Sequence, residues 1–210
     1  MKNVIIFDFD GTLVNTSRYY YEINNKILKM FGKKPFEDYE KFIEKFTGRY
    51  WKDVYKELGF NDYELKNVPE LFTNEAKVYK DKINIVNNMD SVIKELHKNY
   101  KFGIVSNNFK DVIENILKKY ELLNFFDCIV DVNVAKPKPH PDQLLLCIKK
   151  LDSKPESTNF VCDTRIDIEC GRRAHVKRII AVSYGYENKN KLIDADIVID
   201  KPDELLKYFR

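Results

Sequence analysis

Two aspartates at the end of an apolar run are the residues in this sequence best suited to chemistry. Asp8 and Asp10 follow the β-branched run Val4 to Phe7, and because strand side chains alternate, both carboxylates point the same way. Two like charges this close need a cation, and Mg²⁺ would also neutralise a bound phosphate. One carboxylate could then attack phosphorus while the other moves protons, with the Thr12 hydroxyl holding a phosphate oxygen. The alternative is an ordinary Asp-Gly turn through Gly11.

Two further segments carry groups that suit a phosphoryl group. Ser106 and Asn107 end a second predicted strand, Phe102 to Val105, where a small hydroxyl and backbone N–H groups suit phosphoryl oxygens. Lys136 is a cation on a proline-stiffened segment, with Lys138 as the nearby alternative. Taken separately, the first segment also fits an ordinary loop and the second a surface lysine.

A second pair of acids follows another predicted strand. Asp163 and Asp167 are four residues apart and would share one face of a helix that begins there. The alternative is a helix N-cap followed by a first-turn acid. The four elements come in the order acid pair, hydroxyl, lysine and acid pair, and three of them lie at strand ends. Their joint occurrence predicts one site at the carboxyl edge of a sheet.

Short apolar runs alternate with helical patterns and predict the scaffold for this site. The runs suit buried parallel strands, and the alternation implies an α/β sheet with right-handed crossovers. The predicted strands are Val4 to Phe7, Phe102 to Val105, Cys128 to Val130, Phe160 to Val161, Ile179 to Val182, and Ile197 to Ile199. Residues 16 to 82 break the rhythm, because they read as helix throughout and hold about half of the aromatic residues. An insertion directly after the first strand would cover the ligand-binding edge as a lid.

The bulk composition narrows the classes of protein. Among 210 residues, 36 Lys and Arg balance 33 Asp and Glu, and a net charge of +3 gives no reason to expect a nucleic-acid partner. The four cysteines form no C-x-x-C pair, so we expect reduced thiols rather than disulfides or zinc. We see no signal peptide or membrane-length apolar run, and predict a cytoplasmic protein with no membrane partner.

On these motifs the sequence resembles the haloacid dehalogenase superfamily, in the phosphoglycolate phosphatase-like branch with a helical cap between the first and second motifs. The matching segments are F-D-F-D-G-T-L-V, V-S-N-N, A-K-P-K-P-H-P and V-C-D-T-R-I-D-I-E-C-G-R-R-A. The tail V-S-Y-G-Y is also similar. The resemblance implies a Rossmann-like parallel-sheet core, residues 1–15 and 83–210, and a small all-helical cap domain, residues 16–82.

The resemblance also implies roles for the site residues. Asp8 would be the nucleophile and Asp10 the general acid/base. Mg²⁺ would be held by the Asp8 carboxylate, the Asp10 backbone carbonyl and Asp163, with Asp167 in support. Ser106 and Lys136 would bind phosphate, and Lys136, as the lysine before P-x-P, would also restrain Asp8. In the cap, Gly48 and Arg49 lie between two predicted helices, where related caps carry a specificity loop, and Arg49 could read an anionic substrate tail.

These expectations describe a magnesium-dependent phosphatase that acts on a small phosphorylated metabolite through an aspartyl-phosphate. Asp10 argues against a true dehalogenase, which lacks the second aspartate, and no G-x-G-x-x-G follows the first strand to favour a hydride enzyme. A sugar-phosphate mutase or a pyrophosphatase could use the same chemistry. A binding module that has lost activity is the alternative from another class. Monomer and homodimer both stay open.

Overall fold

A six-stranded parallel sheet forms the centre of the computed structural model, which describes residues 3–79 and 81–209. Its strands are β1 (Val4–Phe7), β4 (Lys101–Val105), β5 (Cys128–Val130), β6 (Thr158–Cys162), β7 (Arg178–Val182) and β8 (Ile197–Ile199). Their order is β5-β4-β1-β6-β7-β8, and every neighbouring pair is parallel. All six runs predicted from the sequence are strands, so the predicted α/β, Rossmann-like core is confirmed.

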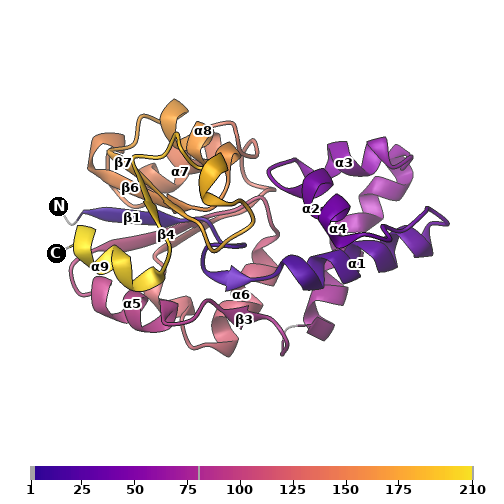
Figure 1. Ribbon diagram of the computed structural model, residues 1–210, viewed down its shortest axis with the longest axis horizontal. Helices are drawn as coiled ribbons and strands as arrows, with labels where there is room; N and C mark the ends of the chain where they lie inside the picture. Colours follow the sequence, from indigo (N-terminus) through magenta and orange to yellow (C-terminus); the bar gives the residue numbers. More distant parts are fainter. Residues whose placement is uncertain (1–2, 80, 210) are drawn as a thin grey trace.

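Helices cover both faces of the sheet (Figure 1), as the runs apolar on both sides require. Alternate residues of β1 pack to opposite sides: Ile5 and Phe7 join one apolar cluster, while Val4 and Ile6 join the other. The first cluster contains α5 (Met89–Leu96), α6 (Lys110–Lys119) and α9 (Leu205–Tyr208). The second contains α7 (Asp142–Lys150) and α8 (Arg165–Arg173). Single 3₁₀ turns complete the connections at Leu123–Phe125, Pro155–Ser157, Lys189–Lys191 and Pro202–Glu204.

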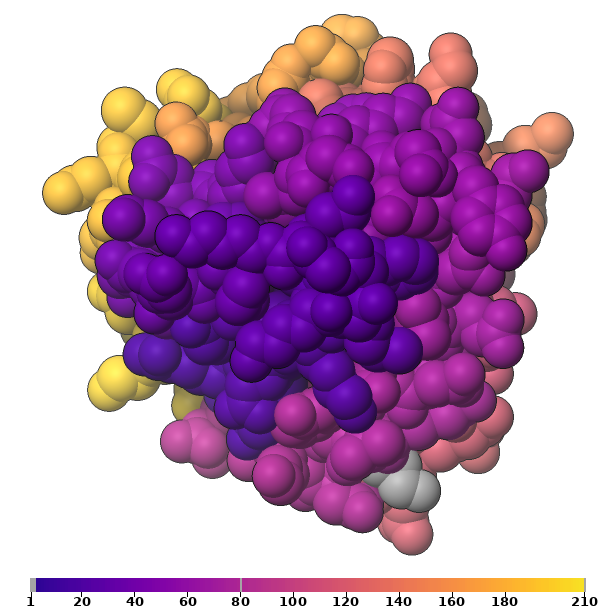
Figure 2. Space-filling view, turned by 90° about the vertical axis from the view of Figure 1, so that its right-hand side faces the viewer, coloured from indigo at the N-terminus to yellow at the C-terminus, as the bar shows by residue number. Residues whose placement is uncertain are grey.

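A helical insertion, Ser17–Tyr79, follows β1 and lies beyond the carboxyl ends of the strands (Figure 1). It consists of α1 (Ser17–Met30), α2 (Tyr39–Phe46), α3 (Trp51–Glu57) and α4 (Asp62–Tyr79). Viewed from this end, the insertion forms most of the molecular surface (Figure 2). The helical character predicted for residues 16–82 is thus confirmed over the described part of that segment.

Two short strands that the sequence did not reveal connect the insertion to the core. β2 (Val14–Asn15) pairs antiparallel with β3 (Asn84–Ile85), so the chain leaves and re-enters the core side by side. Two residues are too few to show an alternating pattern, which explains why the sequence gave no signal for them.

The aromatic residues of the insertion hold its helices together. The ring centroids of Tyr20 in α1 and Phe72 in α4 are 5.0 Å apart, and those of Phe46 in α2 and Tyr55 in α3 are 5.9 Å apart. The buried Tyr55 hydroxyl donates to Asn24 Oδ1 over 2.7 Å, which links α3 to α1. In the described residues, no helix is both long and apolar enough to span a bilayer. All four cysteines are buried and free.

Candidate active site

The carboxyl ends of β1, β4 and β6 bring the predicted site residues together. Asp8 follows β1 directly and its N–H donates to Val161 of β6 over 2.8 Å. Ser106 follows β4 and Asp163 follows β6, so all three side chains meet at one edge of the sheet. Asp8, Ser106 and Asp163 are at most 5 % exposed and line the same cavity.

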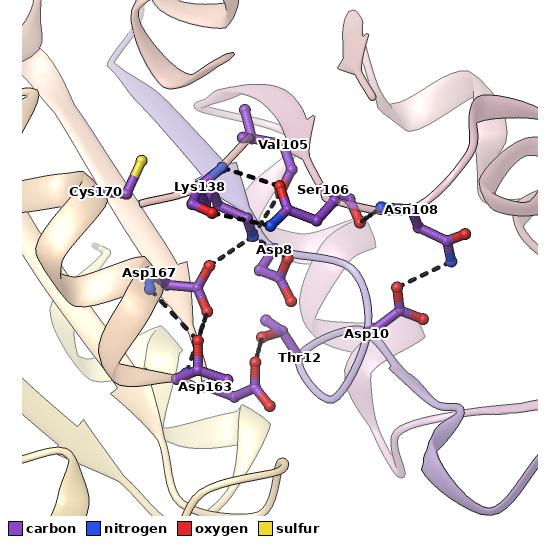
Figure 3. A network of polar contacts seen from close by, with 12 residues as sticks. Asp8, Asp10, Thr12, Val105, Ser106, Asn108, Lys138, Asp163, Asp167 and Cys170 are labelled. Atoms are coloured by element: carbon purple, nitrogen blue, oxygen red, sulfur yellow. Dashed lines mark hydrogen bonds and ion pairs between the residues drawn. The ribbon is translucent and has the colours of Figure 1, made fainter. Parts of the chain in front are cut away.

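The lysine beside Asp8 is Lys138, and the choice of Lys136 was wrong. Lys138 Nζ lies 2.5 Å from Asp8 Oδ1 and 2.5 Å from Asp167 Oδ1, and it also donates to the Val105 carbonyl over 3.2 Å. Figure 3 shows its amine between the two carboxylates. Lys136 is exposed, outside the cavity that contains Asp8.

The backbone explains why Lys138 takes this position. The Asn107 side chain hydrogen-bonds the Lys138 main chain twice: its Oδ1 accepts from the Lys138 N–H over 3.0 Å, and its amide donates to the Lys138 carbonyl over 3.2 Å. The pattern of lysine before P-x-P occurs twice here, once from Lys136 and once from Lys138, so sequence alone could not select the register. With both polar atoms of its side chain on Lys138, Asn107 positions the lysine, and its direct contact with substrate stays a prediction.

Burial and neighbouring charges shift the pKa values of this pair. Loss of solvent raises the pKa of Asp8 to about 7; Lys138 opposes the shift, and the nearby Asp167 and Asp10 add to it. For Lys138, burial acts to lower the pKa, but the carboxylates of Asp167 and Asp8 outweigh it and raise the pKa above its ordinary value. The lysine is therefore a permanent cation that holds Asp8 in place.

Asp8, Asp163 and Asp167 form a buried carboxylate cluster, each with one oxygen within 4.8 Å of the others. Burial, followed by the charges of Asp8 and Asp167, raises the pKa of Asp163 well above its ordinary value. Three crowded acids are stable together only when protonated or when a cation shares them. Oxygen ligands of this kind are those that Mg²⁺ prefers.

Close packing fixes the Asp163 side chain. The Tyr186 N–H donates to its Oδ2 over 2.7 Å, and the Thr12 hydroxyl donates to its Oδ1 over 3.3 Å. A Cβ at Gly11 or at Gly185 would collide with this carboxylate, so both glycines leave the room it needs. Thr12 is fully buried and does not line the cavity. The structure therefore places Thr12 behind Asp163, contrary to its predicted contact with a phosphate oxygen.

Asp167 both caps a helix and contributes a carboxylate to the site, as the two interpretations of this segment separately predicted. Thr164 is the N-cap of α8, and Asp167 completes its capping box by accepting from the Thr164 N–H over 3.2 Å. Its other oxygen is the one that contacts Lys138. The helix start thus orients a carboxylate toward the site.

Asp10 lies apart from the carboxylate cluster, on the side of Asn108 (Figure 3). Its oxygens accept from the Thr16 hydroxyl over 2.8 Å and from the Asn108 amide over 3.0 Å. Tyr20 of α1 also hydrogen-bonds the Asn108 amide, so the insertion contacts this network directly. Burial raises the pKa of Asp10, although these hydrogen-bond donors oppose the shift. A carboxyl with a raised pKa suits a residue that must both give and take a proton.

A cavity of about 180 Å³ lies between the carboxylates and the insertion. Ser106, Asn107, Gly48 and Arg49 all line it, together with Asp8 and Asp10. The Ser106 hydroxyl accepts from the Asn108 N–H over 3.1 Å and can still donate a hydrogen bond. Gly48 has φ of +68° and lies against Ile166 of the core, where a Cβ would approach Cγ1 to 2.7 Å.

Arg49 is occupied by a partner within the insertion. Its guanidinium forms a two-pronged contact with Glu57, with Nη1 3.1 Å from Oε2, and Lys45 Nζ contacts the same carboxylate at 2.5 Å. These hydrogen bonds lower the pKa of Glu57 to about 2. Recognition of an anionic substrate group by Arg49 stays a prediction. It would require Arg49 to break its ion pair with Glu57 or to bind both groups at once.

Sequence reasoning missed several residues that organise the site. Thr16, Tyr20 and Asn108 hold Asp10, and Gly185 and Tyr186 shape the slot for Asp163. The V-S-Y-G-Y tail was a usable signal for the last two, whereas Tyr20 lies in the segment 16–82, for which the sequence predicted only helix.

A family model, curated relatives and solved structures each match most of this chain. The model of the haloacid dehalogenase-like hydrolases matches residues 5–181. The pyrophosphatase PpaX of Bacillus mycoides is 31% identical over 217 residues, covering 97% of this chain and 95% of that protein. The phosphoglycolate phosphatase of Aquifex aeolicus is 30% identical over 215 residues, with the same coverage of 97% and 95%.

Solved structures share the fold. A putative phosphoglycolate phosphatase from Lactobacillus plantarum superposes with a TM-score of 0.88 at 22% identity and covers 100% of both chains. CbbY from Rhodobacter sphaeroides, solved in complex with phosphate, gives 0.87 at 21% identity over 98% of this chain and 96% of its own.

Proposed function

The chain belongs to the haloacid dehalogenase-like hydrolase family and is a hydrolase of the phosphatase type, and we propose that it cleaves a small phosphomonoester through an aspartyl-phosphate on Asp8. One observation carries this proposal. Asp8 lies at the end of β1, held by Lys138 at 2.5 Å, with Asp10 two residues further on and lining the same cavity. A nucleophile oriented by a cation and a nearby acid with a raised pKa are the two groups that this reaction needs.

The carboxylate cluster fits a magnesium ion. Asp8, Asp163 and Asp167 supply buried oxygens within 4.8 Å of one another, and the raised pKa values of Asp8 and Asp163 show how unfavourable their charges are without a cation. These residues would hold Mg²⁺, with the Asp10 backbone carbonyl as a further predicted ligand. When bound, the ion would neutralise charge on the phosphoryl group.

Each remaining residue has a part in two displacement steps. An Asp8 oxygen forms a bond to phosphorus as the bond to the leaving oxygen breaks, and Asp10 gives that oxygen its proton. Asp10 then takes a proton from water, whose oxygen attacks phosphorus and releases phosphate with Asp8 restored. Lys138 keeps Asp8 oriented, and the Ser106 hydroxyl is placed to donate to the phosphoryl group.

The helical insertion would act as a cap over this reaction. We propose that residues 16–82 form a cap domain and residues 1–15 and 83–210 a catalytic core, connected through the β2–β3 ladder. Exclusion of water by the cap decides between hydrolysis and transfer to a second substrate, so a sugar-phosphate mutase is the related alternative. Pyrophosphatase activity is the second candidate, favoured by the 31% identity to PpaX.

Two predictions concern the setting of the protein. The four free, buried cysteines agree with a reducing compartment, and we propose the cytoplasm. We further propose a small phosphorylated metabolite as the partner, with the chain acting as a monomer or homodimer.

Hydrolysis of p-nitrophenyl phosphate by the purified protein tests the proposal. We expect turnover with Mg²⁺, loss of turnover with a chelator, and loss in Asp8→Asn. Absence of metal-dependent turnover would favour the binding-module alternative. Full turnover by Asp8→Asn would remove Asp8 as the nucleophile.

A further inference from the structure

The cavity has an aromatic wall facing its carboxylate end. Eight aromatic side chains line the cavity, and Tyr20 and Tyr186 lie beside Asn108 and Thr16, which hold Asp10. The other six form the wall: Phe42, Phe46, Trp51, Tyr55, Phe72 and Phe109. Phe109 connects the wall to the core, because its ring lies 6.0 Å from Trp51 and 5.9 Å from Phe72. Phe109 directly follows Asn108, which holds Asp10. The wall therefore begins beside the acid that must protonate the leaving oxygen, where the leaving group has to lie.

Positive charge is scarce around this cavity. Among the described residues that line it, the cations are Lys138 and Arg49. Lys138 is committed to Asp8 and Asp167, and Arg49 to Glu57. A second anionic group on the substrate would have to compete with Glu57 for Arg49.

We propose that the substrate of this phosphatase site carries an uncharged leaving group with a flat apolar body. The body would pack against Trp51, Phe72 and Phe109. The volume of about 180 Å³ must also hold the phosphoryl group, so the body can be no larger than one ring, since an apolar cavity of about 150 Å³ is filled by benzene. The inference rests on the proposed phosphatase function and argues against phosphoglycolate and pyrophosphate, both of which bring a second charged group.

A comparison of three substrates tests the charge and shape of the leaving group. Benzyl phosphate and phosphoglycolate both release a primary alkoxide, so intrinsic reactivity is matched, and pyrophosphate is the third. We expect kcat/KM for benzyl phosphate to exceed that for either of the others by at least about tenfold. An equal or higher kcat/KM for phosphoglycolate or pyrophosphate would overturn the inference.

Turnover of p-nitrophenyl phosphate separates the two levels of the proposal. Magnesium-dependent turnover that is lost in Asp8→Asn, combined with a preference for phosphoglycolate, would contradict only the leaving-group inference. Loss of all metal-dependent turnover would contradict the phosphatase proposal on which it rests.

Discussion

Replacing Lys138 by Met removes the ammonium group that lies 2.5 Å from both Asp8 and Asp167. Lys138 is 4% exposed, and both carboxylates are buried as well, so solvent cannot replace the lost charge. Removing one partner from a buried ion pair costs about 3–5 kcal/mol of the free energy of unfolding. Because Asp8 also loses its orientation, we expect kcat to fall about 100- to 1,000-fold.

The sign of the pH dependence follows from the same charges. Lys138 opposes the rise in the pKa of Asp8, so without it this pKa rises further and the folded protein binds more protons than the unfolded chain. A raised carboxyl pKa makes the folded state less stable as pH increases. The destabilisation of Lys138→Met should therefore be smaller near pH 5.5 than near pH 8.

Urea unfolding and p-nitrophenyl phosphate kinetics measure both effects, with Lys136→Met as the matched control. Lys136 is two residues away, exposed and outside the cavity, so we expect its replacement to change stability by less than about 0.5 kcal/mol and to retain activity. Loss of activity in Lys136→Met with near-normal activity in Lys138→Met would refute the assignment.

Three other perturbations test separate parts of the site. Asp10→Asn should lower kcat about 100- to 10,000-fold and leave Mg²⁺ binding intact, because the Asp10 carboxylate lies outside the cluster; equal loss of metal binding would contradict this separation. Because Asp8 has a pKa of about 7 and the pKa of Asp163 is raised, Mg²⁺ binding should release protons and should weaken as pH falls from about 8 to about 6. Calorimetry in buffers of different ionisation enthalpy measures this proton release, and uptake of protons, or no exchange of protons, would contradict the prediction. Gly185→Ala should weaken Mg²⁺ binding about 10- to 100-fold, because its Cβ would lie 2.7 Å from Asp163 Cγ; unchanged binding would mean that the slot is not tight.

The sheet could be predicted from sequence because each strand is buried on both faces. A strand such as β1 consists entirely of apolar residues and ends abruptly at a charged one, which marks both the element and the edge at which it ends. Asp8, Ser106 and Asp163 follow such strands, so their meeting at one edge follows from topology.

Positions on the loops depend on tertiary contacts that the sequence does not display. Lys136 and Lys138 precede proline in the same way, and the Asn107 side chain, 31 residues away in the chain, selects between them. Thr12 has a hydroxyl in the expected motif, but Asp163 fits between Gly11 and Gly185 and accepts the hydrogen bond of this hydroxyl. Arg49 pairs with Glu57 of α3, and this contact cannot be predicted from the sequence of the loop alone.

Acid quenching during turnover, followed by mass spectrometry of the peptide that contains Asp8, tests the central claim most directly. The proposed mechanism predicts one added phosphoryl group on Asp8 in the wild type, in the presence of substrate and Mg²⁺, and none in Asp8→Asn. A phosphoryl group on another residue, or full catalytic turnover by Asp8→Asn, would contradict it.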